Sequence, residues 1–266
     1  MSNGEASKQL LREMHHGHNY SQVEGKREAA FPKSSTIRRR NAGATSQVSK
    51  HSQQQQQRMQ DSSQADEIDP TLDALHPDNI KLEAYEVDLT AVRQVDGFEE
   101  IKYKDAVFLG TVIKGKRHGK GVMKYRNGRQ YEGFWEHDLR DGKGFERYPN
   151  GNTYFGQFKY GKAHSKGVYT WKNGEVYDGE WNQGVKQGYG IWKGVRNDSY
   201  IGEWCASKAH GYGVHHWPNG DRYEGQWKMC LKHGQGTDSF ANGDKYTGEY
   251  LDGKPHGKGE YAWATG

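Results

Sequence analysis

Five histidines recur in the C-terminal part of the chain, and imidazole is well suited to bind a metal or to move a proton near neutral pH. They are His118, His164, His210, His233 and His256. Successive members lie 23 residues apart or twice that distance, so the row follows from a sequence repeat. No cysteine or carboxylate accompanies them at the spacing of a zinc site. The sequence therefore predicts neither a metal site nor a cofactor.

Two further features look like reactive or ligand-binding motifs. Glycines two residues apart, such as Gly119 and Gly121, recur along the chain. They lack the strand-to-helix context of a phosphate-binding loop, so packing is the better interpretation. Cys205 and Cys230 are the two cysteines of a chain that shows no secretory signal, which predicts reduced thiols in the cytoplasm. Because no nucleophile motif stands out either, the sequence predicts a protein that is not an enzyme.

The element that sets these spacings is a repeat of 23 residues in seven copies. Position three is always glycine, between an aromatic residue at position one and a large apolar residue at position five. Side chains at alternate positions share one face of a β-strand. Position one is Phe108, Tyr131, Tyr154, Tyr177, Tyr200, Tyr223 and Tyr246. Position five is Val112, Trp135, Phe158, Trp181, Trp204, Trp227 and Tyr250.

A second strand is expected later in each copy. Position fourteen is again always glycine, and we expect the ring of a neighbouring repeat to lie across these bare positions. Position eighteen is aromatic in six copies, and an Asn-Gly pair such as Asn127-Gly128 follows in five. Asn-Gly between strand-forming segments predicts a tight type I′ hairpin turn. Each repeat should therefore be one β-hairpin, and the chain should be all-β.

The segment from Tyr223 to Trp227 (Tyr-Glu-Gly-Gln-Trp), continued by His233-Gly-Gln-Gly and Asn242-Gly243, resembles a MORN repeat (membrane occupation and recognition nexus). The resemblance covers residues 108–266. It implies an elongated, single-layer, twisted antiparallel sheet of seven consecutive hairpins with a grooved shape, used as a scaffold. MORN repeats occur in junctional membrane proteins, lipid kinases, cytoskeletal organisers and axonemal components, so the resemblance implies no single function.

Because a single-layer sheet must expose many rings, we expect a glycine-aromatic groove that holds an extended segment of another protein in a multi-subunit assembly. The candidate binding residues are Tyr131, Trp135, Tyr154, Phe158, Tyr177, Trp181, Tyr200, Trp204, Tyr223, Trp227, Tyr246 and Tyr250. The repeats and the glutamine-bearing tail resemble an axonemal radial-spoke-head protein of protists, which implies a cytoplasmic place in a cilium axoneme or the cytoskeleton. A homodimer is left open.

Composition divides the chain into three parts. Residues 1–69 contain no tryptophan and include a glutamine run from Gln53 to Gln57, which predicts a disordered low-complexity tail. Residues 70–107 are predominantly acidic and are interpreted as a linker or as an N-terminal cap over the first repeat. Residues 108–266 hold the seven repeats.

The first repeat is strongly basic, with seven Lys or Arg and no acid between residues 108 and 130. Lys114, Lys116, Arg117 and Lys120 are candidates for contact with an acidic partner, either anionic lipid headgroups, including phosphoinositides, or an acidic polymer surface. In the competing interpretation the acidic segment folds over this repeat and neutralises part of the cluster. Nucleic-acid binding is not predicted, because the aromatic residues occupy packing positions.

The seven copies of the repeat differ in sequence at several positions. Position eight is Asp138, Ser207 or Cys230 in three copies instead of glycine, and position twelve is Ser165 in one. Repeat four has Gly194 where the others have the position-eighteen ring, and it lacks the Asn-Gly pair. Three explanations remain open for repeat four: drift at a tolerant position, a bend in the sheet, or a partner side chain in place of the missing ring.

Overall fold

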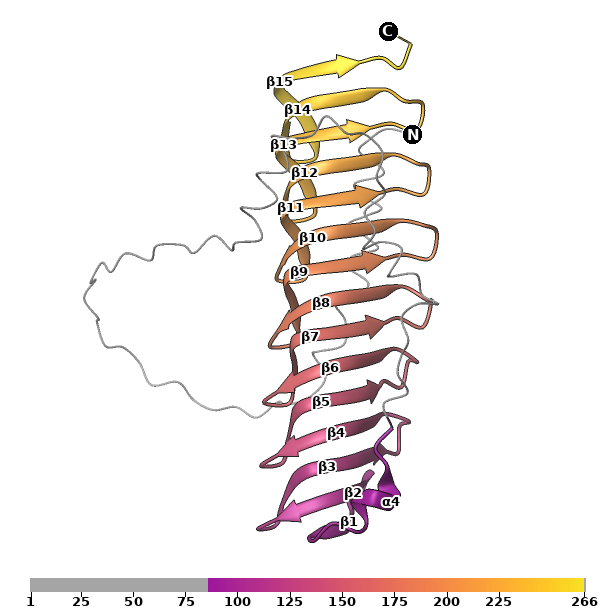
Figure 1. Ribbon diagram of the computed structural model, residues 1–266, viewed down its shortest axis with the longest axis vertical. Coiled ribbons are helices and arrows are strands. Elements are labelled where there is room, and N and C mark those ends of the chain that lie inside the picture. Colours follow the sequence, from indigo (N-terminus) through magenta and orange to yellow (C-terminus); the bar gives the residue numbers. More distant parts are fainter. Residues whose placement is uncertain (1–85, 266) are drawn as a thin grey trace, which may run out of the picture. The chain divides into compact units, whose positions relative to one another are not determined.

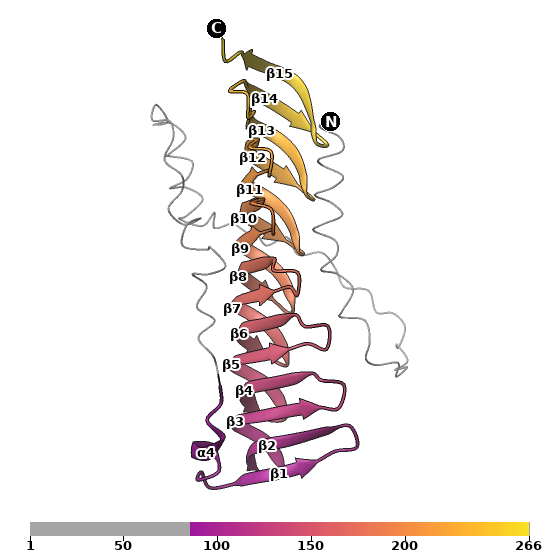
Figure 2. The same ribbon diagram turned by 90° about the vertical axis from the view of Figure 1, so that its right-hand side faces the viewer.

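A computed structural model describes residues 86–265, so the tail predicted for residues 1–69 lies outside the described residues. In the described part, fifteen strands form one antiparallel sheet in which each strand pairs with its neighbours in sequence order (Figure 1). The fold class is therefore the predicted one, a single open all-β sheet. Figure 2 shows the strands in one layer, and their direction turns gradually from β1 to β15.

The elements are short, and every repeat contributes two strands. Before the first repeat lie one helical turn, α4 (Leu89–Val92), and one strand, β1 (Phe98–Lys102). The fourteen strands of the repeats are β2 (Ala106–Ile113), β3 (Lys116–Tyr125), β4 (Gln130–Glu136), β5 (Leu139–Arg147), β6 (Thr153–Lys159), β7 (Lys162–Thr170), β8 (Val176–Asn182), β9 (Val185–Lys193), β10 (Ser199–Cys205), β11 (Lys208–His216), β12 (Arg222–Lys228), β13 (Leu231–Ser239), β14 (Lys245–Leu251) and β15 (Lys254–Ala262).

A continuous row of glycines crosses the sheet at positions three and fourteen. Gly133 lies opposite Gly144, which in turn lies opposite Gly156 on the next strand. A Cβ atom on Gly144 would lie only 2.7 Å from Cε2 of Tyr131. The Tyr131 hydroxyl donates a hydrogen bond to the carbonyl of Phe134 (2.9 Å) and so holds the ring in place. The ring over the glycines comes from the same repeat, which corrects our expectation of a neighbouring one.

The rings of positions one and five interlock along the sheet. Tyr131 makes edge-to-face contacts with Trp135 of its own repeat and with Phe158 of the next, both at 5.1 Å between ring centroids. Trp135 also donates its indole N–H to the carbonyl of Gly121 (3.2 Å). Such ring pairs contribute about 0.5–1.5 kcal/mol each beyond their buried area. The core is thus an aromatic seam that joins each repeat to the next.

The two kinds of turn occur at the opposite strand ends from those that we predicted. At the Asn-Gly pairs only the glycine has positive φ, as at Gly128 (85°), and its N–H donates to the carbonyl of Tyr125 (3.0 Å). This is a three-residue loop, a type I turn followed by a left-handed glycine. The two-residue turns with positive φ at both residues lie at the other hairpin end, as at Lys114 (51°) and Gly115 (71°). The prediction of type I′ turns at Asn-Gly is wrong.

Repeat four keeps the regular hairpin despite its altered sequence. The N–H of Gly194 donates to the carbonyl of Asp198 (2.9 Å), and Asn197 takes the positive φ (61°) that glycine has in other copies. A Cβ on Gly194 would collide with the carboxylate of Asp198, so this side chain fills the space beside the backbone. The pairing of β9 with β10 continues without a shift in register.

Ser165 provides a test of backbone strain. It has φ of 57° at position twelve, where the other copies have glycine, and its side chain is exposed. We expect Ser165→Gly to raise the free energy of unfolding by about 1 kcal/mol, because a Cβ disfavours the left-handed conformation. Urea denaturation followed by circular dichroism measures the change. Ser165→Ala, which keeps the Cβ, should give no such gain, and equal stability of the glycine variant and the wild type would contradict the argument.

The described part of the acidic segment packs on the first repeats. β1 pairs with β2. Val87 and Val92 pack with Val122 on the face opposite the aromatic seam, and the N–H of Val87 donates to the Glu132 carboxylate (3.2 Å). Residues 86–107 therefore add one strand and partly cover this face, whereas the rest of the predicted linker or cap lies outside the described residues.

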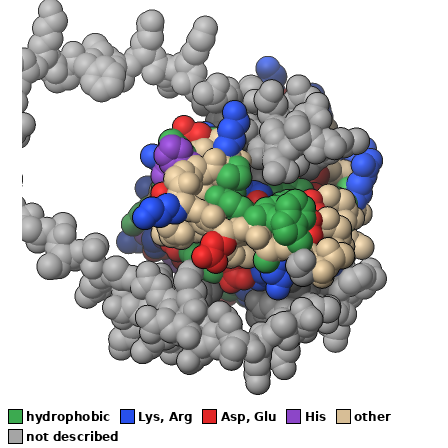
Figure 3. All heavy atoms as spheres, turned by 90° about the horizontal axis from the view of Figure 1, so that it is seen from above, with side chains coloured by type: hydrophobic (Ala, Val, Ile, Leu, Met, Phe, Trp, Pro, Cys, Tyr) green, Lys and Arg blue, Asp and Glu red, His purple; other side chains and the backbone are tan. Residues whose placement is uncertain are grey.

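The other end of the sheet is less covered. Figure 3 looks onto this end and shows apolar side chains gathered there. The large apolar residues exposed in the last hairpin and beyond it are Leu251, Tyr261 and Trp263, with exposed fractions of 44, 44 and 67%.

Candidate functional site

The structure places eleven of the twelve candidate ring residues in the core. Tyr131, Tyr177, Tyr200 and Tyr223 have no exposed surface, and only Tyr246 is partly exposed. The other seven are between 1 and 9% exposed: Trp135, Tyr154, Phe158, Trp181, Trp204, Trp227 and Tyr250. The expectation that these rings are exposed is wrong, because each leading ring lies over the glycine row and each position-five ring fills the gap between two leading rings.

A second set of rings on the same face remains partly accessible. These rings come from position eighteen of most repeats and from position sixteen of repeat three, and all but Phe240 pack beside the buried seam. We call this surface the aromatic ledge, and it consists of Tyr125, Tyr148, Tyr169, Trp171, Trp217 and Phe240. The position-eighteen row was visible in the sequence, but we did not predict a binding role for it. All strands of the described part belong to one sheet, so no second sheet covers the ledge within residues 86–265.

Cations lie on the buried rings at position ten of four repeats. Arg117 lies 4.5 Å from the ring of Trp135, and Lys186 lies 4.7 Å from that of Trp204. Arg140 and Lys232 make similar contacts with Phe158 and Tyr223. This row was not predicted, although the basic residues at position ten are visible in the sequence. Across the seven repeats, position ten is Arg117, Arg140, Ala163, Lys186, Ala209, Lys232 and Pro255.

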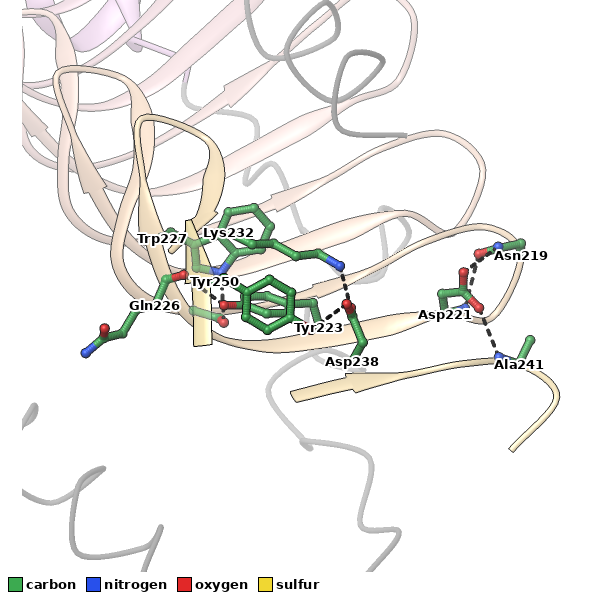
Figure 4. A network of polar contacts seen from close by, with 10 residues as sticks. Asn219, Asp221, Tyr223, Gln226, Trp227, Lys232, Asp238, Ala241 and Tyr250 are labelled. Atoms are coloured by element: carbon green, nitrogen blue, oxygen red, sulfur yellow. Dashed lines mark hydrogen bonds and ion pairs between the residues drawn. The ribbon is translucent and has the colours of Figure 1, made fainter. Parts of the chain in front are cut away.

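Acidic residues at position sixteen neutralise two of these cations. Glu146 is 1% exposed and has one oxygen 2.6 Å from Nη2 of Arg129 and the other 2.6 Å from Nη1 of Arg140. In repeat six, Asp238 forms an ion pair with Lys232 and accepts a hydrogen bond from Tyr250 (2.7 Å), as Figure 4 shows. Position sixteen therefore places a carboxylate beside a cation that comes six residues earlier in the chain.

His215 occupies position sixteen of repeat five, where burial lowers its pKa to about 3, with smaller contributions from His216 and Lys232. Its ring lies parallel to Trp192 at 6.4 Å and packs against Trp217 at 4.2 Å. Because an unfolded histidine takes up its proton near pH 6.5 and the folded one does not, stability should fall as the pH drops from about 6.5 towards 3, by up to about 1.4 kcal/mol per pH unit.

Urea denaturation at pH 7, 5 and 4 tests this expectation. His215→Phe should lose less stability on acidification than the wild type, whereas His256→Phe, at an exposed histidine, should behave as the wild type does. An unchanged pH dependence in His215→Phe would refute the assignment.

The basic cluster of the first repeat is divided between two roles. Lys114, Lys116 and Lys120 are exposed. Arg117 is not free, because its Nε lies 3.0 Å from Oδ1 of Asp138. The backbone N–H of Arg117 also donates to this carboxylate (2.9 Å) and, as the main cause, lowers the pKa of Asp138. Three of the four candidate residues can therefore reach an acidic partner.

The described residues contain no group of three or more metal-ligating side chains. The position-eleven histidines of adjacent repeats are separated by two strand spacings, about 9.6 Å, which is too far for a shared ion. Cys205 is exposed, Cys230 is buried, and neither forms a disulfide. In the described part of the chain, no helix is long and apolar enough to span a bilayer.

The repeat geometry agrees with a known family. The MORN repeat family model matches residues 108–128, 131–153, 154–176, 177–198, 200–222, 223–245 and 246–266. This chain belongs to the MORN repeat family. The MORN match covers every hairpin from β2 to β15 and leaves β1 and α4 outside, so these two elements are additions of this chain to its MORN sheet.

Other comparisons give limited similarity. A stretch of 45 residues is 38% identical to Alsin of Mus musculus and equally to Alsin of Homo sapiens, which is 17% of this chain and 3% of Alsin. The chain therefore matches only a small fraction of these curated relatives. Among solved structures, the TCP10 domain of Danio rerio CPAP, in complex with a STIL peptide, is 11% identical with a TM-score of 0.36, over 60% of this chain and 68% of that chain.

The SAS-4 TCP domain of Drosophila melanogaster, in complex with a proline-rich motif of Ana2, is 13% identical with a TM-score of 0.34, over 62% of this chain and 88% of that chain. At these TM-scores neither structural similarity supports a functional assignment for the MORN chain.

Proposed function

We propose that this chain is a non-catalytic scaffold whose aromatic ledge binds an extended segment of another protein. The observation that carries the proposal is a row of partly exposed rings beside the buried seam, present in repeats one, two, three, five and six. Exposed apolar strips on a protein surface mark interfaces, and aromatic side chains are enriched among the residues that dominate binding. The buried rings of positions one and five support the ledge from below rather than contact the partner.

An extended segment fits the regularity of this surface. The ledge offers one ring or ring pair in each of repeats one, two, three, five and six, with a gap at repeat four. Successive repeats are two strand spacings apart, about 9.6 Å. An extended chain advances about 6.6 Å for every two residues, so a segment lying obliquely across the strands places side chains against successive rings. A compact partner surface would contact only a few of them.

A pull-down with the full chain tests the scaffold. We expect the wild type to retain a stoichiometric partner from a ciliary or cytoskeletal extract, and a variant with Trp171→Ser and Trp217→Ser to lose it. The matched control is Leu139→Ser with Val185→Ser, two apolar residues that are exposed and lie outside the ledge. Absence of any stoichiometric partner, or retention of it by the ledge variant, would count against the proposal.

The cellular setting is a further part of the proposal. The resemblance to axonemal radial-spoke-head proteins, which rests on the repeats and the glutamine run of the tail, supports a cytoplasmic assembly of the cilium axoneme or the cytoskeleton. Localisation of a tagged copy tests it, and a signal at neither structure would contradict it. A homodimer would show as twice the monomer mass in sedimentation, and nucleic acid is not among the expected partners.

A second candidate function uses the exposed lysines of the first repeat as an anionic lipid or phosphoinositide site. Lys114, Lys116 and Lys120 support it, because each basic residue near an anionic membrane contributes about 1 kcal/mol. Co-sedimentation with anionic liposomes should be lost when these three become Glu. In the matched control, three other exposed lysines are changed to Glu: Lys172, Lys228 and Lys254. A wild type that does not sediment would exclude this function.

A further inference from the structure

Lys186 is the one cation of the position-ten row without a carboxylate among the described residues. Arg117 pairs with Asp138, Arg140 with Glu146 and Lys232 with Asp238. No carboxylate oxygen of residues 86–265 lies within the 4.0 Å of an ion pair from the Lys186 ammonium. Its side chain is nevertheless buried, with 6% of the residue exposed. Burial of a charge without a counter-charge is costly, so a carboxylate beside this ammonium would be favourable.

The surroundings of this ammonium are aromatic. Its Nζ lies 4.9 Å from the ring of Trp171, 4.9 Å from Tyr177 and 4.7 Å from Trp204. Trp171 belongs to the aromatic ledge and is partly exposed, so the ammonium lies beside the surface proposed to bind a partner. The preceding position-ten residue, Ala163, is small, partly exposed and packed against the core.

Other charged and polar groups face Lys186 without pairing with it. Burial lowers its pKa to about 8, and Cys230 and Glu175 oppose this shift through their charge. Glu175 already accepts hydrogen bonds from Asn173 (2.6 Å) and from the indole N–H of Trp192 (3.4 Å). Neither group therefore supplies the close contact that the other three cations have.

The chain itself shows what completes such a site. In repeats two and six, position sixteen is Glu146 or Asp238, and each carboxylate reaches the cation of the same repeat. Figure 4 shows this arrangement for Lys232, Asp238 and Tyr250. In repeat four, position sixteen is Trp192, which is 2% exposed and cannot neutralise a charge. The missing component is a carboxylate, carried on a side chain short enough to enter between rings.

We infer that Lys186 is a specificity site that binds the carboxylate of a glutamate or aspartate from the extended partner segment on the aromatic ledge. The inference rests on the proposed scaffold function and adds the chemistry of the partner. The carboxylate accepts hydrogen bonds from Nζ of Lys186 while its neighbouring residues pack on Trp171. A charge-assisted bond among rings is stronger than one in water, because little solvent screens it.

An array of short synthetic peptides tests the inference with the full chain. The peptides come in pairs that differ only by Glu or Gln at the central position, within a sequence rich in Val and Thr. The wild type should bind the Glu member about tenfold more tightly than the Gln member. Lys186→Met should remove the difference. Removal of an unpaired buried charge should also raise the urea midpoint of this variant, so lost discrimination would not reflect unfolding.

Two further variants test whether the preference for Glu peptides depends on the ammonium of Lys186. Trp192→Glu places a carboxylate at position sixteen, as in repeats two and six, and should remove the preference for Glu peptides while the ammonium is kept. Lys228→Met removes an exposed charge elsewhere and should leave the preference unchanged. Equal binding of both peptide members by the wild type, or a preference that survives Lys186→Met, would overturn the inference and leave the scaffold intact. Failure to bind any peptide, together with an empty pull-down, would overturn both.

Discussion

Replacing Glu146 with alanine is expected to lower the free energy of unfolding by about 3–5 kcal/mol, because it leaves two arginines without their buried counter-charge. The carboxylate is 1% exposed and lies 2.6 Å from both Arg129 and Arg140. It also accepts a hydrogen bond from the hydroxyl of Tyr148 (3.0 Å). Arg140 in turn lies over the rings of Tyr131 and Phe158. Loss of the charge therefore affects the seam between repeats two and three.

Urea denaturation followed by circular dichroism measures this loss. Glu180→Ala is the matched control, because Glu180 pairs with Lys166 at 3.2 Å while both side chains are largely exposed, and such pairs contribute about 0–1 kcal/mol. A Glu146→Ala variant that loses no more stability than Glu180→Ala would show that the arginines find water or other partners. Hydrogen exchange should place the loss at β4 to β6, since repeat arrays are stabilised by interfaces between neighbours.

The sequence was sufficient to predict the sheet but not the role of its rings. The alternation of Tyr131, Gly133 and Trp135 predicted a strand with these three residues on one face. Their burial was not predicted, because it depends on the pairing of Gly133 with Gly144, which lets the tyrosine ring lie flat on the backbone. A pattern of period two says which residues share a face and not how closely rings of adjacent repeats interlock.

The prediction of the turn type was wrong for a related reason. Asn-Gly is common both in type I′ turns and in type I turns that end with a left-handed glycine. The hydrogen bond from Gly128 to Tyr125 and the negative φ of Asn127 distinguish them, and neither can be read from the sequence. In the candidate site, the pairing of Arg140 with Glu146 was readable in principle as a cation followed six residues later by an acid. That spacing brings the two side chains together because the strand pairing shifts register between Gly144 and Arg140, where Gly142 has a left-handed backbone (φ of 92°). The sequence does not show this shift.

The glycine row makes the second strong prediction. Gly213→Ala should lower the free energy of unfolding by about 3 kcal/mol, because an added methyl group overpacks a closed core. Its Cβ would lie 2.6 Å from Cζ and 2.7 Å from Cε2 of Tyr200. That ring cannot move away easily, because it is fully buried and its hydroxyl donates to the carbonyl of Glu203 (3.0 Å). Thermal and urea denaturation should both show the loss.

Two comparisons separate this collision from a general effect of alanine. Gly184→Ala meets no atom within 4 Å but has φ of 88°, so it should cost only about 1 kcal/mol through its backbone. Tyr200→Leu removes the ring that Gly213→Ala would strike. If the collision is the cause, the double variant should be more stable than the sum of the two single losses predicts. Strict additivity would instead mean that the glycine is required by the strand itself, whether or not a ring lies over it.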